Sequence, residues 1–318
     1  MITETDIIKK YLKKLTFKNK FSLNLSDDVY YFKKKKLVFS LDTYNEGVHF
    51  FNNSDPKKFV KKIFRSSISD IIAKGSIPFV YFLSLSLNKT SKKWLNNLRI
   101  ALLQDSKKFN LHLGGGDTVY SNKLSISFSI IGLANKKAIL RSGAKHNDDI
   151  YLTGNLGDSY IGLLIMQKKL NIKKNKKYFI DQYQRPNLAF NFSKFLYKFA
   201  NSSTDISDGI YIDLKNICVS SNCGALLNFN NIPFSHQSKN LSKKKKIGLL
   251  KCFTQGDDYQ ILFTSSIKNR NFIRSIANKT NTKISRVGSI TSKKHIKMSV
   301  NGRIIDLKST KQGFIHKF

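Results

Sequence analysis

The sequence has few acidic residues and few cysteines. Its 318 residues include 20 Asp and Glu against 56 Lys and Arg, which gives a formal net charge of +36. The three cysteines, Cys218, Cys223 and Cys252, are odd in number and lack the spacing of a metal site, which argues against a disulfide framework or a structural zinc. We therefore expect a reducing, cytoplasmic setting.

Long apolar runs are also missing. The most apolar stretches, residues 77–87 and 124–134, fall short of the roughly 18–20 residues that a membrane helix needs. Residues 1–12 alternate apolar and charged side chains instead of forming the apolar core of a secretory signal. We expect no membrane partner.

The common nucleotide-binding and hydrolase motifs are absent as well. The chain has no G-x-x-x-x-G-K-[ST] loop, no Rossmann glycine spacing, no kinase H-R-D motif and no G-x-S-x-G elbow. Any nucleotide chemistry must therefore use another kind of site.

Lysine dominates the charge and occurs along nearly the whole chain, with runs at 33–36, 173–177 and 243–246. It accompanies abundant Asn, Ile, Phe and Tyr and little Glu, Pro or Trp, a mixture typical of a genome biased toward A and T. We expect a solvated lysine surface and no nucleic-acid partner, although a polyanion partner is the alternative that such a charge allows. The charge should also draw anionic nucleotides toward an acidic cleft.

The hydrophobic pattern, with 41% apolar residues, predicts two mixed α/β domains, residues 1–138 and 139–318, since domains commonly run about 100–200 residues. Asp55 as N-cap and Pro56 at the first position mark one helix start. The expected helices span residues 5–15, 55–74, 94–107, 159–166, 188–199 and 210–220. The expected strands span residues 29–32, 37–40, 79–87, 111–113, 124–134, 149–153, 225–229, 258–264 and 283–290.

Much of the scarce acid is gathered in short clusters beside small residues or apolar runs. These clusters contain Asp27-Asp28, Asp42, Asp70, Asp117, Asp205, Asp208 and Asp257-Asp258. A fold that brings several carboxylates together must neutralise them, and oxygen ligands with few His or Cys nearby favour Mg²⁺. Because Mg²⁺ held by carboxylates keeps positions open for phosphates, the pattern indicates phosphoryl transfer.

Single motifs leave alternatives open. The Asp27-Asp28 pair suits a metal site or a local turn cap, and His49 suits a ligand contact or a structural hydrogen bond. Gly115-Gly116-Asp117, expected directly after a buried strand, allows close backbone approach to a phosphate, but a plain strand exit has the same composition.

An ordered series of motifs spans almost the whole chain. The series consists of Ser26-Asp27-Asp28, Ser40-Leu41-Asp42, Gly47-Val48-His49-Phe50, Ser69-Asp70-Ile71-Ile72-Ala73-Lys74-Gly75, Gly115-Gly116-Asp117-Thr118, Arg141-Ser142-Gly143-Ala144, Thr153-Gly154 with Leu156-Gly157-Asp158-Ser159, Arg185-Pro186, Asp205-Ile206-Ser207-Asp208-Gly209 and Gly256-Asp257-Asp258-Tyr259. In this order the motifs resemble the thiamine-monophosphate kinase family. The resemblance implies ATP-dependent phosphorylation of thiamine monophosphate to thiamine diphosphate. It also implies an α/β (α+β) fold of two mixed-sheet domains, of the aminoimidazole ribonucleotide synthetase type, and a homodimer that pairs the N-terminal sheets.

The resemblance also implies roles for individual residues. Ligands of Mg²⁺ or its waters are implied at Asp28, Ser40, Asp42, Asp70, Asp117, Asp205 and Asp208. Contacts to ATP are implied at Gly116, Asp117, Arg141 and Ser207. Contacts to thiamine monophosphate are implied at His49, Asp257 and Phe314, where Phe314 offers an aromatic face or packs the tail. No general base is expected, since the attacking phosphate oxygen is already anionic.

Three departures from the family pattern bear on activity: Ser26 replaces a glycine, Leu41 a threonine and Asp257 a glutamate. They spare the main aspartates, so we expect an active enzyme. The alternatives are another ATP-dependent enzyme of the same superfamily, or a non-catalytic nucleotide or nucleic-acid binder. Selenophosphate synthetases and hydrogenase-maturation relatives use a cysteine near one terminus, which this chain lacks, because its first cysteine is Cys218 and it ends in Phe318.

Overall fold

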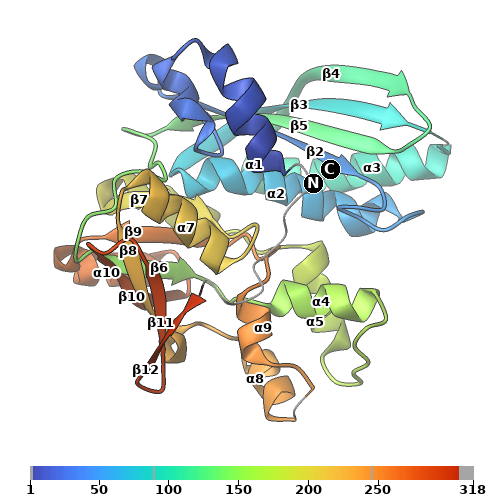
Figure 1. The fold of residues 1–318 in the computed structure, drawn as a ribbon. Coiled ribbons are helices and arrows are strands. Elements are labelled where there is room, and N and C mark those ends of the chain that lie inside the picture. The colour runs from blue at the N-terminus through green and yellow to red at the C-terminus, as the bar shows by residue number, and fades with distance from the viewer. Residues whose placement is uncertain (1–2, 89, 245, 308–318) are drawn as a thin grey trace.

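The computed structural model, which describes residues 3–88, 90–244 and 246–307, contains two mixed sheets (Figure 1). The first sheet has the strand order β1-β2-β5-β3-β4 and the second the order β12-β11-β8-β10-β6-β9-β7. The first sheet consists of β1 (Tyr30–Phe32), β2 (Leu37–Asn45), β3 (Ser76–Leu87), β4 (His112–Tyr120) and β5 (Ser125–Ala134). The second consists of β6 (Asp149–Thr153), β7 (Ala200–Asp205), β8 (Gly224–Asn228), β9 (Ile261–Ser265), β10 (Ile284–Thr291), β11 (Ile296–Val300) and β12 (Arg303–Asp306).

The helices lie along the faces and ends of these sheets. They are α1 (Glu4–Ile7), α2 (Pro56–Ala73), α3 (Lys92–Phe109), α4 (Asp158–Met166), α5 (Lys176–Gln184), α6 (Phe190–Ser193), α7 (Ile210–Ser220), α8 (His236–Lys243), α9 (Leu249–Phe253) and α10 (Arg270–Lys279). None of the helices in the described ranges is both long and apolar enough to cross a membrane.

Helices α2 and α3 cover one face of the first sheet (Figure 1). Side chains alternate along β5, so that Ile126, Phe128 and Ile130 are fully buried against the helices. On the opposite side large apolar side chains are exposed, including Leu41 and Leu113. Strand β4 pairs in parallel with β3 and forms one edge of the sheet.

Helix α2 is the central element for function because it lies between the first sheet and the second half of the chain. As predicted, Asp55 caps it by accepting a hydrogen bond from the Lys57 backbone N–H, and Pro56 is its first residue. Most of its length is buried, including the charged side chains of Lys62 and Arg65. Buried charges of this kind require partners, and their partners come from distant parts of the chain.

The second sheet packs against its own apolar core. Strand β6 lies in the interior of the sheet and is buried along its whole length, with Ile150 and Leu152 fully excluded from solvent. Helix α7 starts directly after the turn at residues 206–209 and packs Leu214 and Ile217 into this core. The loop between β7 and α7 therefore has a rigid element on each side.

The structure confirms the mixed α/β class and the expected helices that became α2, α3, α4 and α7. The predicted continuous helix over residues 188–199 is wrong: short α6 and a 3₁₀ turn at Leu196–Lys198 replace it. The segment divides its apolar side chains between two clusters, since Leu188 packs with the first core and Phe192 with a cluster of the second half. Strands β7, β11 and β12 were not predicted. Gly115-Gly116-Asp117 lies inside exposed β4 and not after a buried strand, which corrects that expectation.

Candidate functional site

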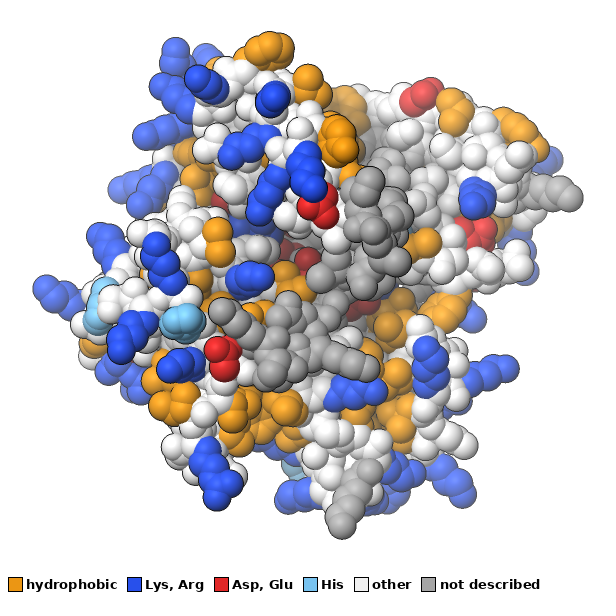
Figure 2. Space-filling view, viewed as in Figure 1, with side chains coloured by type: hydrophobic (Ala, Val, Ile, Leu, Met, Phe, Trp, Pro, Cys, Tyr) orange, Lys and Arg blue, Asp and Glu red, His pale blue; other side chains and the backbone are white. Residues whose placement is uncertain are grey.

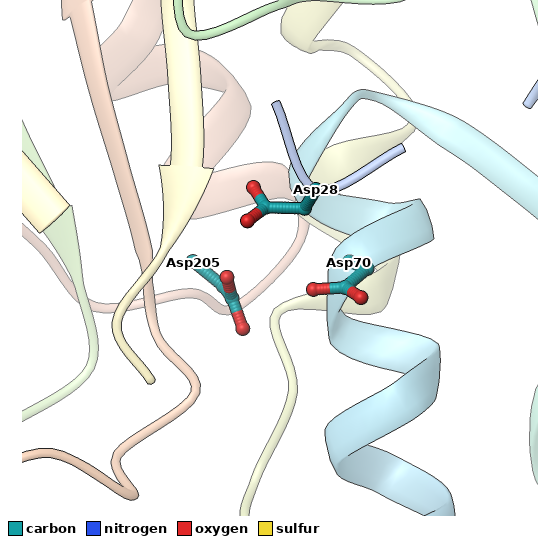
Figure 3. A group of neighbouring side chains, drawn as sticks. All are labelled: Asp28, Asp70 and Asp205. Atoms are coloured by element: carbon teal, nitrogen blue, oxygen red, sulfur yellow. The ribbon is translucent and has the colours of Figure 1, made fainter. Parts of the chain in front are cut away.

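Three of the predicted metal-binding aspartates meet where the two halves of the chain touch (Figure 3). Asp28 precedes β1, Asp70 lies near the end of α2, and Asp205 ends β7. One carboxylate oxygen from each lies within 4.8 Å of the others. Segments far apart in sequence thus supply oxygen atoms to one small volume.

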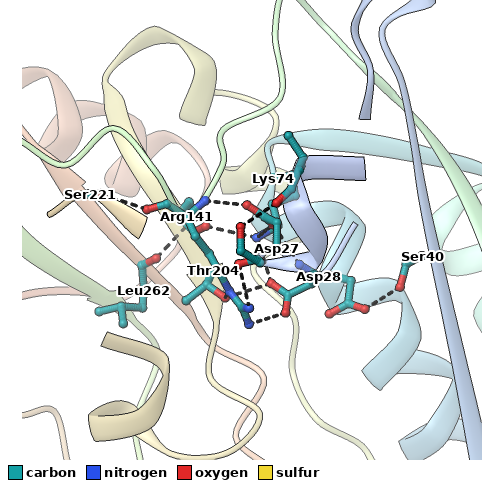
Figure 4. Close-up of polar contacts among 12 residues, drawn as sticks. Asp27, Asp28, Ser40, Lys74, Arg141, Thr204, Ser221 and Leu262 are labelled. Atoms are coloured by element: carbon teal, nitrogen blue, oxygen red, sulfur yellow. Dashed lines mark hydrogen bonds and ion pairs between the residues drawn. The ribbon is translucent and has the colours of Figure 1, made fainter. Parts of the chain in front are cut away.

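Asp28 has two cationic partners (Figure 4). Lys74 Nζ lies 2.9 Å from its Oδ2, and Arg141 donates to its Oδ1. Thr204 Oγ1 donates a further hydrogen bond of 3.2 Å. Burial alone would raise the pKa of Asp28, but the charges of Arg141 and Lys74 outweigh it and lower the pKa. Asp28 is therefore ionised throughout the neutral range.

Asp27, its neighbour, has a different environment. Lys74 Nζ lies 2.7 Å from Asp27 Oδ1, and the Arg141 backbone N–H donates to Asp27 Oδ2 at 2.8 Å. Lys74 itself is fully buried; burial lowers its pKa, but Asp27 and Asp28 raise it above its usual value. Lys74 and the Arg141 backbone thus hold Asp27, whereas Asp28 binds the side chains of both cations and also contributes an oxygen to the three-carboxylate group.

Among the described residues no cation forms an ion pair with Asp70 or Asp205, although the charges of Lys74 and Arg141 act on Asp205 from a greater distance. Ser40 Oγ donates to Asp70 Oδ2 at 2.5 Å, and Ser69 Oγ donates to Asp205 Oδ2. Burial raises the pKa of Asp70, and the charges of Asp42 and Asp205 raise it further. Burial and the charge of Asp28 raise the pKa of Asp205 to about 7. Both carboxylates therefore favour a nearby positive charge.

Asp42 lies on β2, two residues after Ser40 and on the same face of the strand. Tyr44 OH is 3.2 Å from Asp42 Oδ2 and 2.9 Å from Ser67 Oγ, which links the strand to α2. Burial raises the pKa of Asp42 as well. Its carboxylate and the Ser40 hydroxyl thus border the same acidic region.

The loop between β7 and α7 carries Ser207 and Asp208, both half-buried. A second loop holds it in place: the Asp257 backbone N–H donates to Ser207 O at 2.8 Å, and the Tyr259 N–H donates to Ile206 O at 2.8 Å. A Cβ on Gly256 would lie 1.8 Å from Ser207 O, so only glycine permits this approach. The two loops form one backbone-paired unit.

Asp213, in the first turn of α7, is a buried carboxylate that sequence reasoning missed. Its Oδ2 accepts a hydrogen bond of 3.1 Å from the Gly209 N–H, which closes the loop onto the helix. Its Oδ1 is buried without a hydrogen-bond partner among the described residues. Burial and the charges of Asp208 and Asp205 raise its pKa. In the sequence, only its position four residues after Gly209, in the first turn of the expected helix, sets Asp213 apart.

Gly116 and Asp117 lie on exposed β4. A Cβ on Gly116 would lie 1.9 Å from Leu83 O, so the close pairing of β3 and β4 requires glycine there. Asp117 Oδ1 accepts from the Thr118 N–H at 2.8 Å. Among the described residues Asp117 is not part of the three-carboxylate group.

Two of the residues predicted to contact thiamine monophosphate, His49 and Asp257, lie beside Lys62, about two helical turns before Asp70 on α2. His49 Nδ1 accepts a hydrogen bond of 2.9 Å from the Asn45 N–H. Asp257 Oδ2 lies 3.0 Å from Lys62 Nζ, and Tyr259 OH donates to Asp257 Oδ1 at 2.8 Å. Phe314 lies outside the described residues. Lys62 was not singled out from the sequence because it is one of many lysines.

The donor set fits Mg²⁺. The converging atoms are carboxylate oxygens, and within the described ranges no His or Cys joins the group. Hard oxygen ligands suit Mg²⁺ and are a poor match for zinc sites rich in nitrogen and sulfur. The raised pKa values of Asp70 and Asp205 point the same way, because a divalent cation there would favour their charged forms.

Comparison with known proteins agrees with this geometry. Residues 26–134 match the family model described as AIR synthase related protein, N-terminal domain. The thiamine-monophosphate kinase of Buchnera aphidicola subsp. Schizaphis graminum is 37% identical over 323 residues, covering 98% of this chain and 98% of the relative. The chain belongs to the thiamine-monophosphate kinase family. The thiamine-monophosphate kinase of Escherichia coli K12 is 34% identical over 74% of this chain and 73% of its own length.

Solved structures of the thiamine-monophosphate kinase family share the fold. The structure of AaThiL complexed with AMPPCP and TMP matches with a TM-score of 0.85 at 26% identity, over 99% of this chain and 97% of that chain. The thiamine-monophosphate kinase from Stenotrophomonas maltophilia K279a gives a TM-score of 0.77 at 28% identity, over 83% and 85% of the two chains. These findings confirm the predicted family and the predicted α/β fold class.

Proposed function

We propose that this protein phosphorylates thiamine monophosphate with ATP to give thiamine diphosphate. Its membership of the thiamine-monophosphate kinase family supports the reaction, and the observation that carries it is the convergence of Asp28, Asp70 and Asp205. A similar structure was solved with AMPPCP and TMP, an ATP analogue and the phosphate acceptor.

We assign the site residues as follows. Carboxylates and one hydroxyl hold Mg²⁺ and its waters, nucleotide contacts come from β4, Arg141 and the β7–α7 loop, and acceptor contacts come from the turn at His49, the loop at Asp257 and Phe314. The proposed Mg²⁺ ligands are Asp28, Ser40, Asp42, Asp70, Asp117, Asp205 and Asp208; the ATP contacts are Gly116, Asp117, Arg141 and Ser207; the acceptor contacts are His49, Asp257 and Phe314.

The residues act by positioning and by charge. When bound, Mg²⁺ supplies positive charge that reduces the repulsion between the phosphates of donor and acceptor. Ser40 orients the carboxylate of Asp70 and Ser69 that of Asp205, each by a hydrogen bond. An ion pair with Lys74 holds the carboxylate of Asp28. Because the acceptor phosphate oxygen is already anionic, no side chain has to remove a proton. We propose direct in-line transfer, so protein incubated with γ-labelled ATP should hold no acid-labile phosphate.

The molecular organisation is also a proposal. We divide the chain into residues 1–138 and 139–318, and separate buried clusters around Phe64 and around Leu152 support this division. We further propose a homodimer that pairs the first sheets. The exposed apolar side chains of Leu41 and Leu113 on that sheet favour burial in a partner.

A cytoplasmic setting is supported by three free cysteines, all of them buried. On the face seen in Figure 2, Lys and Arg side chains are spread over many elements instead of forming one basic stripe. This distribution supports a solvated lysine surface, so we propose no nucleic-acid partner.

The test compares the purified protein with an Asp70→Asn variant in the presence of ATP, Mg²⁺ and thiamine monophosphate, with thiamine diphosphate measured by chromatography. We expect product from the wild type and a loss of roughly 100-fold or more in the variant, because a change at a metal ligand should cost at least as much as a change in its outer shell. Asp181→Asn is the matched control, since Asp181 pairs with Arg185 near the surface and is not part of the three-carboxylate group. ATP binding without product in the wild type would refute the proposed reaction.

A further inference from the structure

A cavity of about 430 Å³ lies beside the acceptor residues, between the start of α2 and the α4–α5 pair. Its volume falls within the range of about 300–1,000 Å³ found for small-molecule sites. Half of the lining side chains are aromatic or apolar, among them Phe51, Phe59 and Ile180, and the other half are polar or charged, among them Asp55 and Lys58. The aromatic and apolar half of the wall can pack against a flat organic ring.

Lys62 is in the wall of this cavity, and its side chain is only 7% exposed. Its ammonium lies 3.0 Å from Asp257 Oδ2 and 3.3 Å from the His49 carbonyl oxygen. It also lies 4.0 Å from the centroid of the Tyr183 ring, a cation–π distance. One buried cation therefore contacts both predicted acceptor segments and the cavity wall.

Asp257 is held firmly as a result. Lys62 binds one of its carboxylate oxygens and Tyr259 OH donates to the other. Its backbone has φ of 67°, a conformation that non-glycine residues rarely adopt without support from the surrounding structure. Without Lys62 the carboxylate would lose the cation that binds its Oδ2, and the His49 turn would lose its link to α2.

The charges around the cavity are balanced. The Asp257 carboxylate offsets the Lys62 ammonium, and the wall carries one further charge of each sign, on Asp55 and Lys58, so a ring with a positive charge faces no net positive wall. Lys62 already lies over one face of the Tyr183 ring, so Phe51 and Phe59 are the wall residues whose negative quadrupole charge favours such a ring. A neutral or cationic heterocycle therefore fits this wall.

We propose that Lys62 is a positioning residue for the acceptor: it holds Asp257 and the His49 turn beside the cavity, and the cavity receives the ring portion of thiamine monophosphate. This inference rests on the proposed function and names the part of the site that recognises the acceptor rings. Lys62 supports acceptor binding by holding Asp257 and His49 in place. It is not part of the three-carboxylate group proposed to bind Mg²⁺ beside the phosphates.

The test measures the KM for thiamine monophosphate and for ATP separately in Lys62→Met, Lys62→Arg and Ile180→Trp. Ile180→Trp fills the cavity without touching the ion pair. We expect Lys62→Met and Ile180→Trp to raise the KM for thiamine monophosphate by about tenfold or more, with the KM for ATP changed by less than about twofold. Lys62→Arg keeps the charge and should restore part of the loss.

Binding of a non-hydrolysable ATP analogue and the melting temperature separate this role from a general loss of structure. If Lys62→Met does not fold, folded Lys62→Arg must still raise the KM for thiamine monophosphate, because its guanidinium cannot occupy the same point. Unchanged acceptor KM values in folded Lys62 variants, or in Ile180→Trp, would overturn the inference. Failure of the wild type to form thiamine diphosphate would instead refute the proposed function, so the two failures are distinct.

Discussion

Replacing Asp205 with asparagine should stabilise the metal-free protein while it impairs the site. Asp205 is 2% exposed, and burial together with the charge of Asp28 raises its pKa to about 7 from the usual 3.8. The folded state therefore holds a proton on Asp205 that the unfolded state releases. Since the unfolded state binds fewer protons, the free energy of unfolding falls as pH rises from about 4 to 7 and then levels off.

The size of the effect follows from the pKa shift. The folded and unfolded pKa values of Asp205 differ by about 3, and each pKa unit corresponds to about 1.36 kcal/mol, so ionised Asp205 lowers the free energy of unfolding by about 4 kcal/mol at pH 8. At pH 5 this decrease is only about 2 kcal/mol, because Asp205 is still protonated in the folded state. The asparagine side chain of the variant would carry no such charge and would still accept the hydrogen bond from Ser69.

Urea unfolding in EDTA at pH 5, 6, 7 and 8 measures this difference. We expect Asp205→Asn to be more stable than the wild type, with a gap that widens toward pH 8, and we expect added Mg²⁺ to narrow it by stabilising the wild type. Asp149→Asn is the matched control of opposite sign: the cations Arg270 and Arg286 hold the pKa of Asp149 low against the effect of burial, so its loss should destabilise the protein. A variant that is less stable in EDTA at pH 8, or a gap independent of pH, would refute the reasoning.

Two further predictions concern the scaffold. Arg65→Leu leaves a buried carboxylate without its cation, 2.7 Å away in the native protein, and should lower the free energy of unfolding by about 3–5 kcal/mol, whereas the exposed Arg99→Leu should have little effect. Equal urea midpoints for the two variants would contradict this. Gly116→Ala places a methyl group 1.9 Å from a carbonyl oxygen of β3 and should lower the free energy of unfolding by about 1–3 kcal/mol. Gly248→Ala, with open space around it, should leave the urea midpoint unchanged.

The local features of the fold were predictable because their signals are local. The Asp55-Pro56 start of α2 and the apolar pattern behind it predict the helix that carries Asp70. The ordered motifs also predict Asp28 and Asp205 as partners of Asp70, and the structure brings those three side chains together. Whether all of the predicted ligands bind metal stays a prediction.

The remaining features depend on contacts across the chain. Lys62 and Lys74 are buried and form ion pairs with aspartates. Nothing in the local sequence distinguishes them from the many surface lysines, so their burial could not be predicted. Asp213 is similarly concealed, because its burial results from how α7 packs. Strands β11 and β12 are only five and four residues long and mix apolar with polar residues, so tertiary pairing and not the local pattern determines them.

Helix α2 sets the distance between two parts of the site. Lys62 and Asp70 are eight residues apart on it, which sets their Cα atoms about 12 Å apart along the axis at 1.5 Å per residue. Adding or removing one residue between them would also turn one end by about 100° relative to the other and pull a buried charge from its partner. The distance between the ring cavity and the carboxylate cluster is thus fixed by residue count, so the length of chain between Lys62 and Asp70 cannot change without loss of one end of the site.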